Sequence, residues 1–159
     1  MKFKALEKLI LFPFETRNIL FIVAFIAHAA FFSLVDPDYY LHMMAGKYMV
    51  LHKSLPYLDV FSFTMTGQPW HLHEWLFEVL VFTIFSAGGE HGVVLFVSGI
   101  GILALFIAFR AGFDHTKRRY GDILVALVFL IVYLPFVQPR PQIITFLCYA
   151  INNVFSHSL

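Results

Sequence analysis

The chain has 159 residues, of which 60% are hydrophobic and 13% are charged, and its formal net charge is +1. Soluble domains average about 25% charged residues, so this composition is poorly matched to water and favours a membrane protein. The small net charge gives no basis for nucleic-acid binding, and the single cysteine, Cys148, excludes an internal disulfide. We therefore expect an all-α, polytopic membrane helix bundle.

Residues 1–17 carry lysines at positions 2, 4 and 8, followed by Arg17, among apolar residues at helical spacing. Positive charge near a first apolar segment favours the cytoplasmic side of the membrane. The pattern predicts a short helix on the cytoplasmic membrane face, and the first apolar run is too long for a cleaved signal peptide. The alternative is a charged tail that only fixes the orientation.

Apolar runs of the length that a membrane helix requires then recur along the chain. They predict four membrane spans and a fifth that is incomplete, in a single module covering residues 1–159, with these bounds: 18–35, 72–87, 92–109, 123–137 and 143–155.

With the N-terminus in the cytoplasm, alternating spans would place residues 36–71 outside and the stretch "GGEH" inside. The loop with Lys117, Arg118 and Arg119 would then lie outside, and "VQPRPQ" would lie inside. An external lysine–arginine loop conflicts with the preference of positive charge for the cytoplasm. Either the number of spans is wrong by one, or these three residues bind a lipid phosphate outside.

The external loop, residues 36–71, begins with a helix signal. Pro37 suits the first helical turn and Asp36 suits its N-cap. Apolar residues then recur at three- and four-residue steps, which predicts an amphipathic helix along the outer membrane surface. The predicted apolar stripe consists of Leu41, Met44, Ala45, Tyr48 and Leu51.

Candidate site residues lie at both ends of this loop. Asp38 and His42 are four residues apart and would share a helix face. If the two loop ends meet, their polar residues form one cluster. The first end contributes Asp36, Asp38 and His42, and the second contributes His71, His73 and Glu74. Such a cluster suits a divalent cation, Mg²⁺ or Mn²⁺, on Asp36 and His71, a sugar or phosphate, or a general base.

Each of these residues also has a simpler interpretation. Asp36 serves as a helix cap, His42 as an interfacial side chain and Asp59 as a turn initiator. Acids within apolar segments usually face a cavity or a partner, so Glu78 is predicted to pair with a helix outside this chain.

Two stretches resemble a known group of proteins. The run "DPDYYLHMMAGKYMVLHKSLPYLDVFSFTMTGQPWHLHEWLFEVLVFTIFSAGG" and the later "QPRPQIITFL" are similar to the first external loop and to a later motif of bacterial GT-C-fold membrane glycosyltransferases. This class includes protein O-mannosyltransferases and lipid A aminoarabinose transferases. The resemblance extends from Asp36 to about Leu147.

The resemblance implies transfer of a sugar from a polyprenyl-phosphate donor outside the cytoplasm. A carboxylate of the first external loop would deprotonate the acceptor, a role for Asp38 with Asp36 in support. His42, His73 and Glu74 would help bind substrate, and Lys117, Arg118 and Arg119 would stabilise the departing phosphate.

Proteins of this fold are usually much longer. We therefore expect an N-terminal fragment of a larger domain that is inactive alone and needs missing helices or a partner subunit. The alternative in a different class is a small non-enzymatic membrane protein, either an assembly subunit or a metal-handling factor built on His42, His71 and His73.

Overall fold

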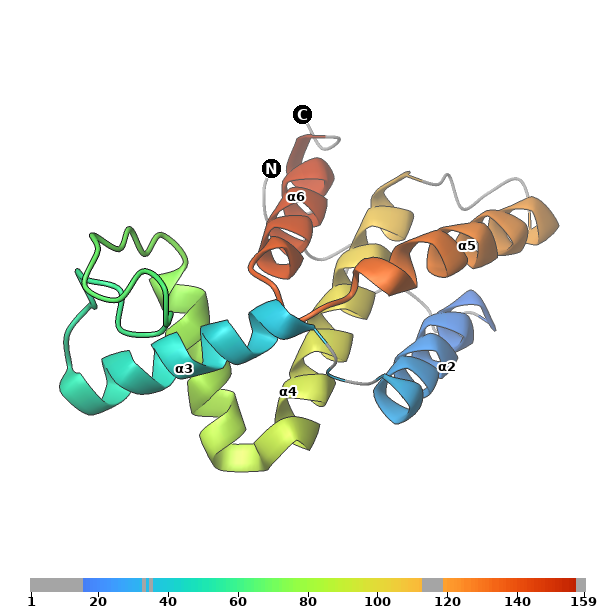
Figure 1. Cartoon of the computed structure of the whole chain (residues 1–159). Helices are drawn as coiled ribbons and strands as arrows, with labels where there is room; N and C mark the ends of the chain where they lie inside the picture. The colour runs from blue at the N-terminus through green and yellow to red at the C-terminus, as the bar shows by residue number, and fades with distance from the viewer. Residues whose placement is uncertain (1–15, 33, 35, 113–118, 157–159) are drawn as a thin grey trace. The chain divides into compact units, whose positions relative to one another are not determined.

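The computed structural model describes residues 16–32, 34, 36–112 and 119–156. In this part of the chain the regular elements are helices, and the extended pairing is a single isolated bridge between Leu58 and Pro69 (Figure 1). The helices are α2 (Thr16–Phe31), α3 (Pro37–His52), α4 (Trp75–Gly112), α5 (Arg119–Tyr133), the short 3₁₀ helix η1 (Leu134–Phe136) and α6 (Gln142–Ser156). The all-α prediction is confirmed, while the predicted segment 1–17 lies outside the described residues apart from the first two residues of α2.

The chain divides into two compact units. The first, called here the bundle unit, comprises Met1–Phe32, Val97–Gln138 and Gln142–Leu159. The second, called the loop unit, comprises Ser33–Phe96 together with Pro139–Pro141. The short segment Pro139–Pro141 therefore packs in the same unit as residues that come much earlier in the chain.

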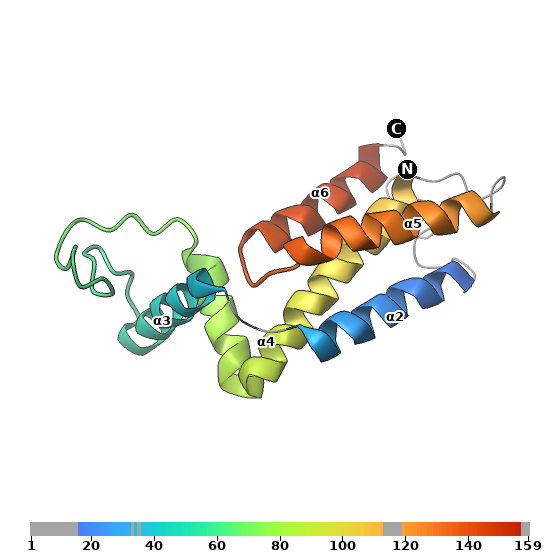
Figure 2. The same ribbon diagram turned by 45° about the vertical axis from the view of Figure 1, so that its right-hand side comes forward.

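An apolar core holds α2, the C-terminal part of α4 and α5 together in the bundle unit (Figure 2). Phe21 packs against Phe106 and Phe109, with ring centroids 5.3 and 5.5 Å apart. The buried core residues are Phe21, Ala24, Ile102, Leu105, Phe109, Ala126 and Leu130. Their spacing on each helix is the three- and four-residue step of a single packed face.

Helix α4 replaces two predicted spans with one bent helix. Gly89 has φ 61° and ψ −156°, a backbone conformation that glycine alone adopts without strain, and α4 consists of two arms that meet there (Figure 1). The predicted break after residue 87 was therefore right in position, but the helix resumes directly after Gly89.

Within the described residues, α4 is the one helix long and apolar enough to cross a membrane, by length and composition, over Trp75–Arg110. The other apolar helices, Asn18–Phe31, Leu124–Phe136 and Gln142–Ser156, have between 10 and 17 residues. The helix lengths thus support one candidate span rather than the four or five predicted.

Helix α3 begins as predicted, and the face that it buries is largely distinct from the apolar stripe predicted for the membrane surface. Asp36 is its N-cap, Pro37 is its first residue, and the Asp38 backbone N–H donates to Asp36 Oδ1 at 3.1 Å. The buried face consists of Tyr39, His42, Ala45, Gly46 and Met49. Three residues of the predicted stripe, Leu41, Met44 and Leu51, are exposed.

Gly46 explains which face of α3 is buried. A Cβ atom at this position would lie 2.1 Å from the Glu78 carbonyl oxygen of α4. The two helix backbones therefore touch at Gly46, as small residues permit. This contact turns the glycine and the histidine one turn before it toward α4, and leaves the longer apolar side chains outside.

Asp59 organises the segment between α3 and α4. Its carboxylate accepts hydrogen bonds from the Phe61 and Ser62 backbone N–H groups at 2.8 and 2.9 Å and from the Ser62 hydroxyl. The Ser62 hydrogen bonds lower the pKa of the Asp59 carboxyl. Asp59 is thus a turn residue, as its simpler interpretation predicted.

Candidate functional site

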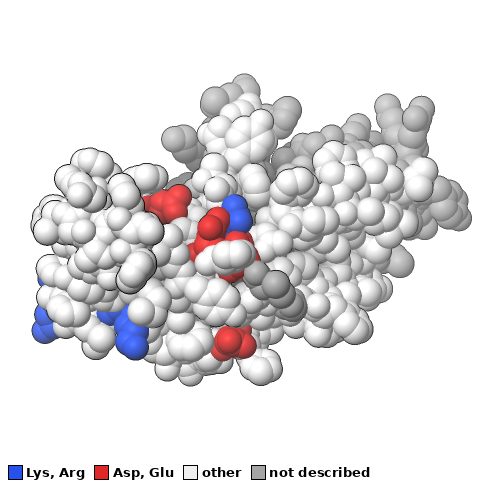
Figure 3. Space-filling view, viewed as in Figure 1, with Lys and Arg blue, Asp and Glu red and all other residues white. Residues whose placement is uncertain are grey.

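The two acids that open α3 converge on Arg140. Arg140 Nε lies 2.5 Å from Asp36 Oδ2, and Nη2 lies 2.9 Å from Asp36 Oδ1. Nη2 also lies 2.9 Å from Asp38 Oδ2. Acidic and basic atoms accordingly lie beside one another in the space-filling view (Figure 3). A bidentate pair of this kind fixes the orientation of both planar groups.

Arg140 and Asp36 hold each other in the charged state. The hydrogen bond from Arg140 lowers the pKa of the Asp36 carboxyl, and the Asp38 N–H acts in the same direction. The hydrogen bond to Asp36 raises the pKa of Arg140, and the charges of Asp36, Asp38 and Glu74 add to this effect.

Asp36 and Asp38 differ in solvent exposure and in how many of their carboxylate oxygens contact Arg140. The Asp36 side chain is 5% exposed and both of its oxygens are engaged by Arg140. The Asp38 side chain is 55% exposed and contacts Arg140 through one oxygen. Asp38 is therefore the carboxylate with an oxygen open to an incoming group.

A second group lies where α3 meets α4. His42 Nδ1 is 3.2 Å from Glu78 Oε1, and His42 Nε2 is 3.7 Å from Glu74 Oε2. Glu74 directly precedes α4, and its carbonyl accepts the Glu78 N–H at 3.2 Å, so the two carboxylates are one helical turn apart on one face. Each of the three residues offers a possible ligand atom within 4.8 Å of the other two.

Glu78 is the most buried acid of this group. Its side chain is 4% exposed, and its second oxygen, Oε2, is buried with no hydrogen-bond partner among the described residues. The sequence predicted a partner in a helix outside the chain, whereas the structure supplies His42 from α3. An ionised carboxylate with one unsatisfied buried oxygen is costly, so this position calls for a further positive or donor group.

The two histidines at the far end of the loop lie in a different place from His42. His71 and His73 line a pocket of about 250 Å³ together with Tyr57 and Trp70. His73 Nδ1 donates to the His71 carbonyl oxygen at 3.1 Å. The possible metal group in the described residues consists of His42, Glu74 and Glu78 and includes neither Asp36 nor His71.

The predicted convergence of the loop ends is thus found in part. Asp36, Asp38, His42 and Glu74 are linked through direct contacts or through their charges on Arg140. His71 and His73 have contacts of their own. Lys117 and Arg118 lie outside the described residues, and Arg119 is described only as the first residue of α5.

Two site residues, Arg140 and Glu78, belong to sequence patterns that do not by themselves identify their partners. Arg140 belongs to the quoted "QPRPQ" motif, but its acidic partners are separated from it by more than a hundred residues. Glu78 follows Glu74 by four residues, which places both on one helix face. A histidine facing such a pair from another helix is visible only once the helices are packed.

One ion pair and one longer-range charge effect disagree with the predicted alternation of loops across the membrane. Arg140 of "VQPRPQ" bonds Asp36, although these segments were predicted on opposite sides. Burial raises the pKa of Tyr39 in α3 to about 12, and the nearby charge of Glu90 in "GGEH" contributes to the shift. The charge of Glu90 therefore reaches α3, although "GGEH" was predicted on the opposite side of the membrane from α3.

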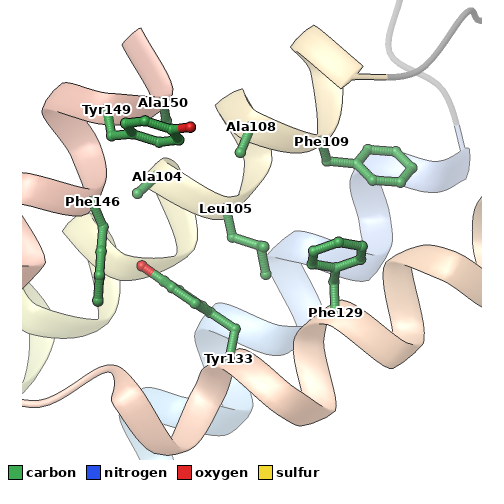
Figure 4. A pocket seen from close by; sticks show the side chains of 9 residues that line it. All are labelled: Ala104, Leu105, Ala108, Phe109, Phe129, Tyr133, Phe146, Tyr149 and Ala150. Atoms are coloured by element: carbon green, nitrogen blue, oxygen red, sulfur yellow. The ribbon is translucent and has the colours of Figure 1, made fainter. Parts of the chain in front are cut away.

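An apolar cavity of about 320 Å³ lies in the bundle unit between α4, α5 and α6 (Figure 4). Aromatic rings of Phe129, Tyr133, Phe146 and Tyr149 line it beside small residues of α4. The Tyr133 hydroxyl is buried and has no hydrogen-bond partner among the described residues.

Comparisons of the chain with protein-family models, with curated proteins and with solved structures give no match.

Proposed function

We propose that this protein is a multi-pass protein of the bacterial inner membrane that carries a glycosyl-transfer site on its extracytoplasmic side. The donor is a sugar on polyprenyl phosphate, and Asp38 is the base that takes the proton of the acceptor hydroxyl. The observation that carries the proposal is the convergence of Asp36, Asp38 and Arg140. The resemblance of the stretches that contain these residues supplies the reaction class.

The three residues have complementary chemistry for such a transfer. Inverting transfer needs a carboxylate with a free oxygen and a cation near the departing phosphate. Asp38 offers the free oxygen, and Asp36 keeps Arg140 in place through its two bonds. The proposal therefore gives the phosphate role to Arg140 in place of Lys117, Arg118 and Arg119.

The linings of two cavities are suited to the two chemical parts of such a donor, the sugar and the hydrocarbon chain. The loop-unit pocket that contains Tyr57, Trp70 and His73 combines aromatic faces with polar nitrogen atoms, as saccharide sites commonly do. The bundle-unit cavity offers an almost wholly apolar lining for a hydrocarbon chain.

The bend of α4 favours a different membrane topology from strict alternation. At 1.5 Å per residue, the arm from Trp75 to Gly88 is about 21 Å long and the arm after Gly89 about 34 Å. The hydrocarbon core is about 30 Å thick, so the second arm matches it, while the first arm carries Glu78 on the face that packs against α3. In the proposed topology the first arm stays on the outer side with α3, and α2, the second arm of α4, α5 and α6 cross.

This topology returns the loop of Lys117, Arg118 and Arg119 to the cytoplasmic side, where positive charge is preferred. It also keeps Arg140 beside Asp36 on the outer side. Exposed apolar side chains of α3, such as Leu41 and Met44, would then face lipid headgroups and acyl chains.

Cysteine labelling tests the topology. Cys148 is the single cysteine, so Cys148→Ala gives a background for introduced thiols. In intact cells, Ser54→Cys and His91→Cys are expected to react with a membrane-impermeant maleimide, and Thr116→Cys only after permeabilisation. Protection of position 91 together with labelling of position 116 in intact cells would instead establish the alternating arrangement.

Transfer activity tests the base. Membranes containing the chain are incubated with radiolabelled polyprenyl-phosphate mannose, glucose or aminoarabinose, and label is measured in the lipid and protein fractions. Asp38→Asn is expected to lower transfer about 100-fold or more, because general-base catalysis contributes factors of about 10² to 10⁴.

Glu90→Gln is the matched control, since it removes an exposed acid from the same unit without touching Arg140. It is expected to retain transfer. Equal activity of Asp38→Asn and the unaltered chain would remove the base assignment. Absence of transfer from all three donors by correctly inserted chain would contradict transfer by this chain alone and would favour the fragment that needs further helices or a partner subunit.

A further inference from the structure

We propose that His42, Glu74 and Glu78 form a binding site for a divalent transition-metal cation, with Zn²⁺ as the best-matched ion. The site lies near the Asp36–Asp38–Arg140 group but shares no ligand with it, and it does not depend on the proposed transfer reaction.

The ligand arrangement is that of a site built on two helices. Glu74 and Glu78 project from one turn at the start of α4, and His42 faces them from α3. Three such protein ligands with remaining open positions are typical of catalytic zinc sites. Ligands about 2.1 Å from a tetrahedral ion lie about 3.4 Å from each other, so the present spacing, with all three atoms within 4.8 Å, needs only a small closure.

Burial makes the group unusual for a solvated acidic patch. The side chains of His42 and Glu78 are 10% and 4% exposed. Glu78 Oε2 is buried without a hydrogen-bond partner in the described part of the chain, although Oε1 of the same carboxylate faces His42. A bound cation would supply the missing interaction for this carboxylate.

The charge around the group also favours a cation. Asp36, Asp38, Glu74 and Glu78 carry four negative charges, and Arg140 supplies one positive charge. Carboxyl groups therefore outnumber cationic side chains in this partly buried region. A dication brings two positive charges to one position, which balances the carboxyl groups more effectively than one more cationic side chain would.

The choice of ion follows from the ligands. An imidazole with two carboxylates suits Zn²⁺ and Mn²⁺ and is a poor set for Mg²⁺ or Ca²⁺, which prefer oxygen ligands alone. Each ring nitrogen of His42 faces one carboxylate, so either tautomer can present one nitrogen to the ion and donate the other N–H to a carboxylate.

Gly46 is the structural basis of the site. It lies one helical turn after His42 on the same face, and its backbone reaches the Glu78 carbonyl. The close approach of α3 and α4 at Gly46 brings the imidazole within reach of both carboxylates.

The test uses the full chain purified in detergent, freed of metal with a chelator and titrated with Zn²⁺ by calorimetry. Wild-type protein is expected to bind one Zn²⁺ and to gain thermal stability from it. His42→Ala and Glu78→Gln are each expected to weaken binding more than about 100-fold, since loss of outer-shell partners alone costs about 10- to 100-fold.

His91→Ala and Glu90→Gln are the matched controls, because they remove an exposed histidine and an exposed acid from α4. Both are expected to bind Zn²⁺ like the wild type. If Glu78→Gln does not fold, Glu74→Gln takes its place, since the Glu74 side chain is 34% exposed. Undiminished Zn²⁺ binding in His42→Ala and the available glutamine variant, or no binding by the wild type up to about 1 mM Zn²⁺, the weak end of the affinity scale, would overturn the proposal.

Discussion

Gly46→Ala is expected to destabilise the loop unit by about 3 kcal/mol or more. The added methyl carbon would lie 2.1 Å from the Glu78 carbonyl oxygen and 2.9 Å from the Phe82 Cβ, so α3 and α4 must move apart. Overpacking in a well-packed interior typically costs about 1 to 3 kcal/mol, and a backbone obstacle cannot rotate away as a flexible side chain can. Thermal unfolding in detergent, followed by tryptophan fluorescence, measures the effect.

The fluorescence is specific to the unit concerned, because both tryptophans of the chain, Trp70 and Trp75, belong to the loop unit. Gly88→Ala is the matched control, since a Cβ there meets nothing within 4 Å. This control is expected to leave stability unchanged or to raise it by up to about 1 kcal/mol, as alanine favours helix more than glycine does. Equal unfolding midpoints for the two variants would show that α3 and α4 do not touch at Gly46.

Arg140→Ala is expected to cost about 2 to 3 kcal/mol of stability. Hydrogen bonds to charged groups are worth about 1.5 to 3 kcal/mol, and the change leaves the Asp36 carboxylate buried without its cation. Part of the loss is regained in the double variant Asp36→Asn with Arg140→Ala, which removes the unpaired charge. The same fluorescence-detected unfolding in detergent gives the free energies of the four proteins in this cycle.

The pH dependence of stability provides an independent measure of this pair. The folded-state pKa of Asp36 is lowered, so its contribution is fully present above the unfolded-state pKa of about 3.9 and is lost as pH falls through the folded-state value. In Arg140→Ala this contribution is absent, so the difference in stability between the variant and the wild type should be largest above about pH 4 and should narrow as the pH falls. Identical acid-unfolding curves would contradict the pairing.

Local sequence signals predicted the beginnings of helices well. Asp36 and Pro37 marked the start of α3, and Asp59 marked a turn, because capping and turn formation depend on residues a few positions apart. The apolar runs likewise marked α2, α4, α5 and α6, since hydrophobic length is a property of the chain itself.

The buried face of α3 was not predictable in the same way. Periodicity identified Leu41, Met44 and Leu51 as part of an apolar stripe for the membrane surface, and it gave no information on the face that meets α4. The structure instead buries His42 and Gly46, a choice made by the contact with α4 that Gly46 allows. Counting hydrophobic residues cannot detect a helix face that packs because a glycine allows the two backbones to touch.

The candidate site shows the same division between local and distant information. The acids at the start of α3 were identified from their spacing, and Asp38 with His42 from the helical period. Their cation, Arg140, lies 104 residues from Asp36, and no periodicity connects positions so far apart. The break near Gly89 was predicted but the bent continuation of the helix was not, because two glycines in an apolar run indicate a break without giving its angle.

The bond between Asp36 and Arg140 also has a consequence for biosynthesis. Ribosomes deliver a chain from its N-terminus, so α3 emerges long before the segment Pro139–Pro141 that completes its unit. Until Arg140 is synthesised, the carboxylate of Asp36 in the nascent chain must be solvated by water or bound by the insertion machinery. Translation arrested before Arg140 would therefore leave this half of the molecule open, however well its earlier helices had formed.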